Sequence, residues 1–274
     1  MRFEVKYSKL SYHFFYLKNL TMKWRSCHRE YNEAWLKIIT EFSDYERKLI
    51  DKFWQILSDQ AIYKKTRDYI FNYEKLPEHY EIREIFQGTE KNFLKLWKAL
   101  SKDFDIAKKN LEANIIEHSD EIHQALEILE KFYASKINAN QTGIYLMVLP
   151  ETVASGGGKF ISPNNVLLEG NKERFKSIKI INILIHEMIH LYLEDNLKVK
   201  IYPEFSNQIN YDEFKEIISS LFVPEGYLTK EFFGVKKEFA GEEIKMLNMV
   251  EQYIKSGKQI DEHFVKKVLD HKRA

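Results

Sequence analysis

The stretch Ile178-Lys-Ile-Ile-Asn-Ile-Leu-Ile-His-Glu-Met-Ile-His-Leu-Tyr-Leu193 decides the fold of this chain. Apolar residues occupy most of its positions, so the helix that this pattern predicts is expected to be buried on almost all sides. His186, Glu187 and His190 interrupt the apolar run. Because buried ionisable groups are costly unless they have partners, we expect the chemistry of the molecule to be centred on this helix.

The spacing of the two histidines indicates a metal site. Residues four apart on a helix share one face and lie about 6 Å apart along the axis, so both imidazoles can bind one ion. Glu187 is turned about 100° away, yet its carboxylate can reach a water on that ion. This His-Glu-x-x-His pattern is typical of zinc metallopeptidases. With nine His in 274 residues, we expect on the order of 0.03 chance matches. The alternative is a histidine pair satisfied by hydrogen bonds in the core.

A catalytic zinc site normally has three protein ligands, so a third must lie elsewhere. Glu194 shares the face of the histidines, but on a continuous helix it lies about 12 Å along the axis from His186. It is therefore too distant to be a ligand. We interpret it either as a partner of the ligands or as a solvated helix end.

The next helical segment, Asp212 to Phe222, offers better candidates. On a helical wheel Glu213 borders its apolar face, whereas Glu216 and Asp212 point nearly opposite. We therefore expect Glu213 to be the third ligand, with Glu216 and Glu204 as the alternatives. If it is not a ligand, Glu213 would stabilise the helix dipole as an acidic residue of the first turn.

With these residues the chain resembles the gluzincins, zinc metallopeptidases in which a Glu on a second helix completes His-Glu-x-x-His. Glu213 follows His190 by 23 residues, a spacing that this group uses. The stretch from Glu213 to Pro224 also resembles the ligand helix of the ImmA/IrrE-like metallopeptidases. The resemblance implies one Zn²⁺ per chain, held by His186, His190 and Glu213. It further implies that Glu187 is the general base in peptide-bond hydrolysis.

Short strands are expected just before the metal helix. Ile144 to Leu149 is an apolar run rich in β-formers and followed by a proline, which predicts a buried strand. The runs Lys159 to Ser162 and Val166 to Glu169 flank a Pro-Asn-Asn turn, which predicts a β-hairpin. In zincins a strand of this kind pairs with an extended substrate. The alternative is an ordinary hairpin that covers the core.

The remainder of the chain is expected to be helical. Residues 1–138 contain one glycine and one proline, Gly88 and Pro77, and their apolar residues recur at intervals of three and four. Two closing helices are expected at Glu242 to Tyr253 and Asp261 to Leu269. The predicted fold class is α+β: a zincin-like metallopeptidase region with a small mixed sheet at residues 139–274, preceded by an all-helical region at residues 1–138.

The composition of the chain limits the classes of molecule that it is expected to bind. The net charge is +1, from 42 basic and 41 acidic residues, so the chain lacks the electrostatic footprint of a nucleic-acid-binding protein. A single cysteine, Cys27, excludes an intramolecular disulfide. Neither a signal peptide nor a membrane span is expected, so a cytoplasmic protein that binds a peptide or protein substrate is the default. The oligomeric state stays open.

Several functional alternatives also stay open. The chain could be a regulator or toxin-system component that acts on one partner protein, or a helical interaction protein whose pentapeptide is structural. For a peptidase, a Tyr or His is expected to help stabilise the oxyanion. The candidates are Tyr202, Tyr211, Tyr227 and His263.

Overall fold

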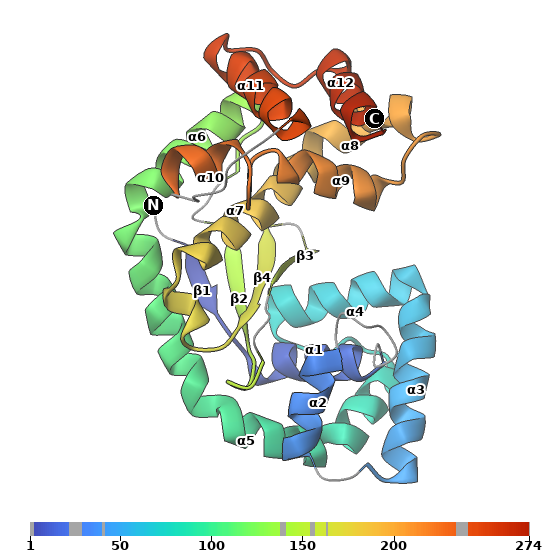
Figure 1. Ribbon diagram of the computed structural model, residues 1–274. Coiled ribbons are helices and arrows are strands. Elements are labelled where there is room, and N and C mark those ends of the chain that lie inside the picture. The colour runs from blue at the N-terminus through green and yellow to red at the C-terminus, as the bar shows by residue number, and fades with distance from the viewer. Residues whose placement is uncertain are drawn as a thin grey trace.

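The computed structural model describes residues 3–21, 29–39, 42–137, 141–153, 157–162, 164–233 and 241–273. Cys27 and Pro163 lie outside these ranges. The fold is α+β, as predicted, with a small sheet enclosed by helices (Figure 1). The helices before the main strands are α1 (Lys9–Thr21), α2 (Arg29–Ile38), α3 (Asp44–Ser58), α4 (Gln60–Tyr73), α5 (Tyr80–Glu117) and α6 (Ser119–Tyr133).

The sheet has four strands in the order β1-β2-β4-β3. Their bounds are β1 (Glu4–Lys6), β2 (Gly143–Val148), β3 (Gly158–Ser162) and β4 (Asn165–Gly170). β1 and β4 run parallel to β2, while β3 pairs antiparallel with β4 and forms one edge. The predicted strand and hairpin are thus confirmed. Residues 1–138 are not all-helical, however, because they contribute β1.

Helices cover both faces of the sheet. The register pairs Gly158 with Leu168 and Tyr145 with Leu167, so Gly158 and Tyr145 point to opposite faces. The Tyr145 hydroxyl donates a hydrogen bond to the Phe71 carbonyl of α4 on one face. On the other face lies α7 (Ile178–Tyr192), the helix with the two histidines. The sheet therefore separates α7 from α4.

The long helix α5 runs along one side of the molecule and contacts both β1 and β2 (Figure 1). Two asparagine side chains of α5 hold the segment that leads into α7. Asn110 donates to the Lys172 carbonyl at 2.8 Å, and Asn114 donates to the Lys176 carbonyl at 3.0 Å. These bonds fix the starting point of the metal helix. Within the described residues, no helix combines the length and apolar character needed to cross a bilayer.

After α7 the chain stays helical but changes its hydrogen bonding. A π-helical turn, η4, continues α7 and leads into α8, and further short helices precede and follow α9. The bounds after α7 are η4 (Leu193–Leu197), α8 (Lys198–Lys200), η5 (Tyr202–Phe205), α9 (Tyr211–Ser220) and α10 (Tyr227–Phe232), while η3 (Arg174–Lys176) directly precedes α7. The closing helices are present as predicted, as α11 (Glu242–Lys255) and α12 (Glu262–Arg273).

A buried histidine connects α1 to α5 in the N-terminal helices. The ring of His13 stacks on Phe93 with centroids 4.0 Å apart, and its Nε2 lies 3.0 Å from the Thr89 hydroxyl. Thr89 donates its own proton to the Ile85 carbonyl, so its oxygen accepts from His13. Burial, helped by the charge of Lys9, lowers the pKa of His13 to about 3. The folded protein therefore holds this imidazole neutral.

This burial predicts an acid-sensitive contribution to stability. The unfolded chain protonates His13 below about pH 6.5, whereas the folded chain resists protonation down to about pH 3. The contribution of neutral His13 to the free energy of unfolding is therefore complete above pH 6.5. It falls as the pH drops from about 6.5 to about 3. Relative to His13→Gln, the free energy of unfolding of the wild type should fall by roughly 2 kcal/mol between pH 6 and pH 4. Urea denaturation at several pH values measures this, and parallel curves for the two proteins would contradict it.

Candidate metal centre

Helix α7, which carries both histidines, starts at a defined cap and is buried along most of its length. The Ser177 hydroxyl accepts a hydrogen bond from the Lys179 amide and so caps the first turn. Glu187 and His190 are buried, with only 6% and 7% of their side chains exposed, while 17% of the His186 side chain is exposed. The two imidazole rings lie with centroids 4.7 Å apart. The helix therefore brings both histidines together at a partly accessible spot.

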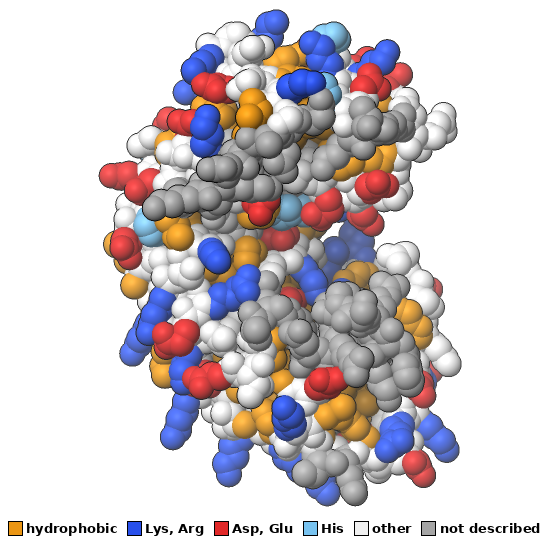
Figure 2. Space-filling model, in the orientation of Figure 1, with side chains coloured by type: hydrophobic (Ala, Val, Ile, Leu, Met, Phe, Trp, Pro, Cys, Tyr) orange, Lys and Arg blue, Asp and Glu red, His pale blue; other side chains and the backbone are white. Residues whose placement is uncertain are grey.

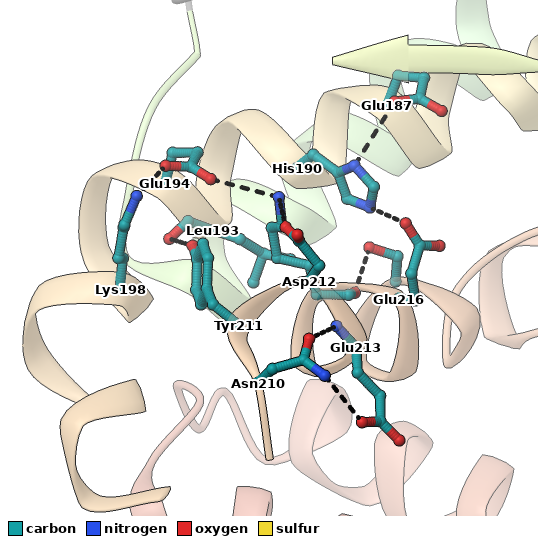
Figure 3. A network of polar contacts seen from close by, with 12 residues as sticks. Glu187, His190, Leu193, Glu194, Lys198, Asn210, Tyr211, Asp212, Glu213 and Glu216 are labelled. Carbon is teal, nitrogen blue, oxygen red and sulfur yellow. Dashed lines mark hydrogen bonds and ion pairs between the residues drawn. The ribbon is translucent and has the colours of Figure 1, made fainter. Parts of the chain in front are cut away.

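A carboxylate from α9 faces both histidines. Glu216 Oε2 lies 3.2 Å from Nε2 of His186, and Glu216 Oε1 lies 3.6 Å from Nε2 of His190. Figure 3 shows His190 between Glu187 on its own helix and Glu216 on α9. Among the described residues, the group whose ligand atoms all lie within 4.8 Å of one another is His186, Glu187 and His190. Glu216 adds a carboxylate that contacts Nε2 of both histidines.

Glu213, the residue expected to be the third ligand, does not lie at this site. Its side chain is exposed and points away from His190 (Figure 3). Its carboxylate accepts a hydrogen bond from the Asn210 side-chain amide at 3.3 Å, and its backbone amide donates to Asn210 Oδ1 at 2.9 Å. The structure therefore does not place Glu213 beside the histidines; it is an acidic residue of the first turn of α9, the position named in its alternative role, and Asn210 is the N-cap. Glu204 is exposed on η5.

The physical reason lies in the way α9 packs. The helical-wheel prediction assumed that its apolar face is turned toward the metal helix. Instead, Phe214 packs against the rings of Tyr202 and Tyr211, with centroids 5.4 and 6.2 Å away. A second side of α9, which carries Lys215 and Glu216, faces α7. A polar face can contact α7 because the contact is made through ion pairs.

The two contacts of Glu216, one from each of its carboxylate oxygens, are close to the spacing of neighbouring ligand atoms around a tetrahedral ion. For bonds of about 2.0 to 2.2 Å at tetrahedral angles, neighbouring ligand atoms lie about 3.3 to 3.6 Å apart. The two observed separations between Glu216 and the histidine Nε2 atoms are 3.2 and 3.6 Å. Nε2 of His190 is buried and has no hydrogen-bond partner among the described residues. This nitrogen lies 3.6 Å from Oε1 of Glu216, so it faces the same carboxylate as His186 does.

Glu187 offers a further carboxylate, within 4.8 Å of ligand atoms of both histidines. Its nearest contact to His190 is to Nδ1, at 3.5 Å, rather than to Nε2. The backbone amide of Phe160 in β3 also donates a hydrogen bond to this carboxylate. Glu187 is therefore held beside the histidines and toward the sheet edge. That position suits a group that acts on a molecule bound next to the metal.

The surroundings of Glu187 adjust its proton affinity. Burial is the largest influence and raises the pKa of Glu187 to about 7. The charge on His186 and the Phe160 amide oppose this rise, while Glu216 and Glu169 add to it. A carboxylate with a pKa close to neutrality can both accept and release a proton near pH 7, as general acid–base catalysis requires.

The two histidines differ in their electrostatic surroundings. Burial and the neighbouring His186 lower the pKa of His190 to about 4, which keeps this ring neutral and ready to bind a metal. Burial also lowers the pKa of His186, but the hydrogen bond to Glu216 and the charges of Glu187 and Glu216 outweigh it and raise the pKa overall. Nδ1 of His186 lies 3.4 Å from the Val223 carbonyl. This contact orients Nε2 toward Glu216.

The sheet approaches the metal helix closely at Gly158. A Cβ at this position would lie 2.7 Å from Glu187 Cγ and 2.7 Å from Ile183 Cγ2, whereas a Cβ at Gly157 would meet nothing within 4 Å. Gly158→Ala is therefore expected to push β3 away from α7 and lower the free energy of unfolding by about 1 to 3 kcal/mol. Gly157→Ala is the matched control and should be neutral or slightly stabilising. Equal urea midpoints for the two variants would contradict this packing.

The residues expected to stabilise an oxyanion are placed less favourably. The hydroxyls of Tyr202 and Tyr211 donate to the backbone carbonyls of Ile209 and Leu193. Tyr227 is a buried residue of α10. His263 lines a cavity of about 480 Å³ together with Tyr133 of α6 and Leu197 of η4. None of these contacts joins one of the four residues to the histidine pair.

The molecule is hollowed beside the part that carries α9. Figure 2 shows an indentation between this part and the part that carries α3 and α4, with acidic side chains at its upper rim.

No protein-family model, curated protein or solved structure matches the chain. The function of the site must therefore be inferred from its geometry.

Proposed function

We propose that the protein is a zinc-dependent peptidase with a zincin-like catalytic region. His186, His190 and Glu216 would hold the ion, and Glu187 would be the general base. The observation that carries this proposal is the shared carboxylate: one Glu216 faces Nε2 of both histidines at 3.2 and 3.6 Å. The gluzincin resemblance is retained, with Glu216 in the role first expected of Glu213.

When bound, zinc would polarise the scissile carbonyl and make an attacking water acidic near neutral pH. The residues of this chain then account for the proton transfers. Glu187 takes the proton of the water as the water attacks the carbonyl carbon, and later delivers it to the leaving amine. Because Glu187 is buried and its pKa is raised to about 7, the carboxylate can perform both transfers at one pH.

Among the described residues, no further strand pairs with the outer edge of β3, and this edge supports an extended peptide as substrate. The Glu169 amide donates to the Gly157 carbonyl, so these two residues form a hydrogen-bonded pair across β4 and β3. Backbone groups alternate in direction along an antiparallel pair, and those of Gly158 therefore face the open edge. Because Gly158 also touches Glu187, a peptide that adds to this edge would lie beside the general base.

Metal analysis and a cleavage assay test the proposal together. Protein purified without chelator should contain about one zinc per chain, and it should cleave a mixed peptide library. Removal of zinc with a chelator should abolish cleavage, and added zinc should restore it. Zinc-loaded protein that cleaves only one partner protein would instead support a regulatory or toxin-system component. The absence of bound zinc would overturn the metal site.

A further inference from the structure

A charged cluster joins the end of the metal helix to the start of α9 (Figure 3). It contains two lysines, two carboxylates and one aromatic ring: Glu194, Lys198, Tyr211, Asp212 and Lys215. Glu194 belongs to the π-helical turn η4, which continues α7. The cluster therefore connects the helix that carries the two histidines with the helix that carries Glu216.

Lys215 makes the ion pair that crosses between these helices. Its Nζ lies 3.6 Å from Glu194 Oε1 and 3.0 Å from Asp212 Oδ1, and it lies 5.1 Å from the centroid of the Tyr211 ring. Only 14% of its side chain is exposed. Lys198 contacts the same groups, with Nζ 3.0 Å from Glu194 and 4.9 Å from the Tyr211 ring centroid. However, Lys198 and Glu194 belong to one continuous helical run, so their ion pair holds no second helix, and the contact of Lys198 with α9 is the one to the Tyr211 ring.

Glu216 depends on the position of α9. Its carboxylate contacts the two histidines, but 61% of its side chain is exposed, so packing around it contributes little to its placement. It directly follows Lys215 in the chain. An ion pair that fixes Lys215 against Glu194 therefore also fixes the backbone from which Glu216 extends.

We propose that Lys215 is a positioning residue that, through its ion pair with Glu194, holds α9 so that Glu216 completes the zinc site. This inference rests on the proposed metal centre. It also gives Glu194, which is too distant to be a ligand, a role as a partner of the ligand helix.

Removing the charge of Lys215 changes zinc affinity in opposite directions in the two cases: one in which Lys215 positions Glu216, and one in which it acts only through its charge. Lys215 is a cation close to the metal site, so its charge alone disfavours Zn²⁺, and removing that charge would strengthen binding. If Lys215 positions Glu216, its loss weakens binding instead. We expect Lys215→Met to weaken zinc affinity about 10- to 100-fold and Lys215→Arg to restore it to within a few-fold. Lys198→Met, which removes a second cation from the same carboxylate and ring, should not weaken it.

Competition with a chromophoric zinc chelator measures the affinities, and the visible spectrum of the Co²⁺-loaded proteins reports ligand geometry. We expect an altered Co²⁺ spectrum for Lys215→Met but not for Lys198→Met. Wild-type protein that binds no zinc would overturn the proposed function itself. Wild-type protein that binds zinc, with an unchanged or higher affinity in Lys215→Met, would overturn only the positioning role.

A second variant tests the ion pair from its other end. Glu194→Gln should weaken zinc binding to a similar degree, and the double variant Glu194→Gln/Lys215→Met should bind no more weakly than either single variant. If the losses of zinc affinity in the two single variants add up in the double variant, Glu194 and Lys215 do not act through their ion pair. If Lys215→Met does not fold, the Co²⁺ spectrum of Glu194→Gln tests the pair, because loss of a distant anion alone would weaken binding without changing the ligand geometry. An unaltered spectrum would then contradict the positioning role.

Discussion

Glu187→Gln is expected to lower the rate of peptide hydrolysis by about 10²- to 10⁴-fold, the usual contribution of a general base. Glutamine keeps the size of the side chain but cannot accept the proton of the attacking water. Glu187 lies beside Nδ1 of His190 and is bonded to the backbone of Phe160 rather than facing the Nε2 atoms. The variant should therefore keep its zinc.

Activity on a peptide library and zinc content per chain, measured on the same preparation, test this expectation. Glu213→Gln is the matched control, because Glu213 is exposed and capped by Asn210. Cleavage by Glu187→Gln within a few-fold of the wild-type rate would remove Glu187 from the catalytic role. Loss of zinc along with activity would make Glu187 a metal ligand instead.

Glu216→Gln is expected to have the largest effect on metal binding. It replaces the carboxylate that faces both histidines at 3.2 and 3.6 Å with a neutral amide. Because even partners of metal ligands contribute about 10- to 100-fold to affinity, loss of a ligand should cost more than about 100-fold. Glu213→Gln, three residues away on the same helix, should leave the affinity unchanged.

These two variants separate the two candidates for the third ligand. Isothermal titration or competition with a zinc chelator gives the affinities, and circular dichroism checks that α9 remains helical. If instead Glu213→Gln binds zinc weakly and Glu216→Gln binds it with wild-type affinity, α9 must be rotated relative to this structure. Equal and wild-type affinities for both would mean that neither glutamate binds the ion.

Much of the fold follows from local sequence patterns. The apolar run around His186 and His190 predicts α7, and the hairpin that precedes it is present as β3 and β4. These elements are encoded by residues close together in the chain, in a helical period or around a turn. The contacts between α7 and β3 at Gly158 arise only after both have formed, and the glycine pattern alone does not indicate them.

Other features depend on contacts between distant residues. β1 is only three residues long and pairs with β2, so Glu4 meets Gly143 from the opposite half of the chain. No local propensity indicates such a pairing. The choice between Glu213 and Glu216 likewise depends on which side of α9 packs against α7. The apolar residue Phe214 has other partners in Tyr202 and Tyr211, and a helical wheel cannot show this.

The central claim is that one zinc ion is held by two residues of α7 and one of α9. An anomalous-scattering map at the zinc edge, from crystals grown without chelator, tests it most directly. We predict a single peak within about 2.0 to 2.2 Å of Nε2 of His186, Nε2 of His190 and a carboxylate oxygen of Glu216. The absence of a peak at the histidines, or a peak bound by Glu213 or Glu187 in place of Glu216, would contradict the claim.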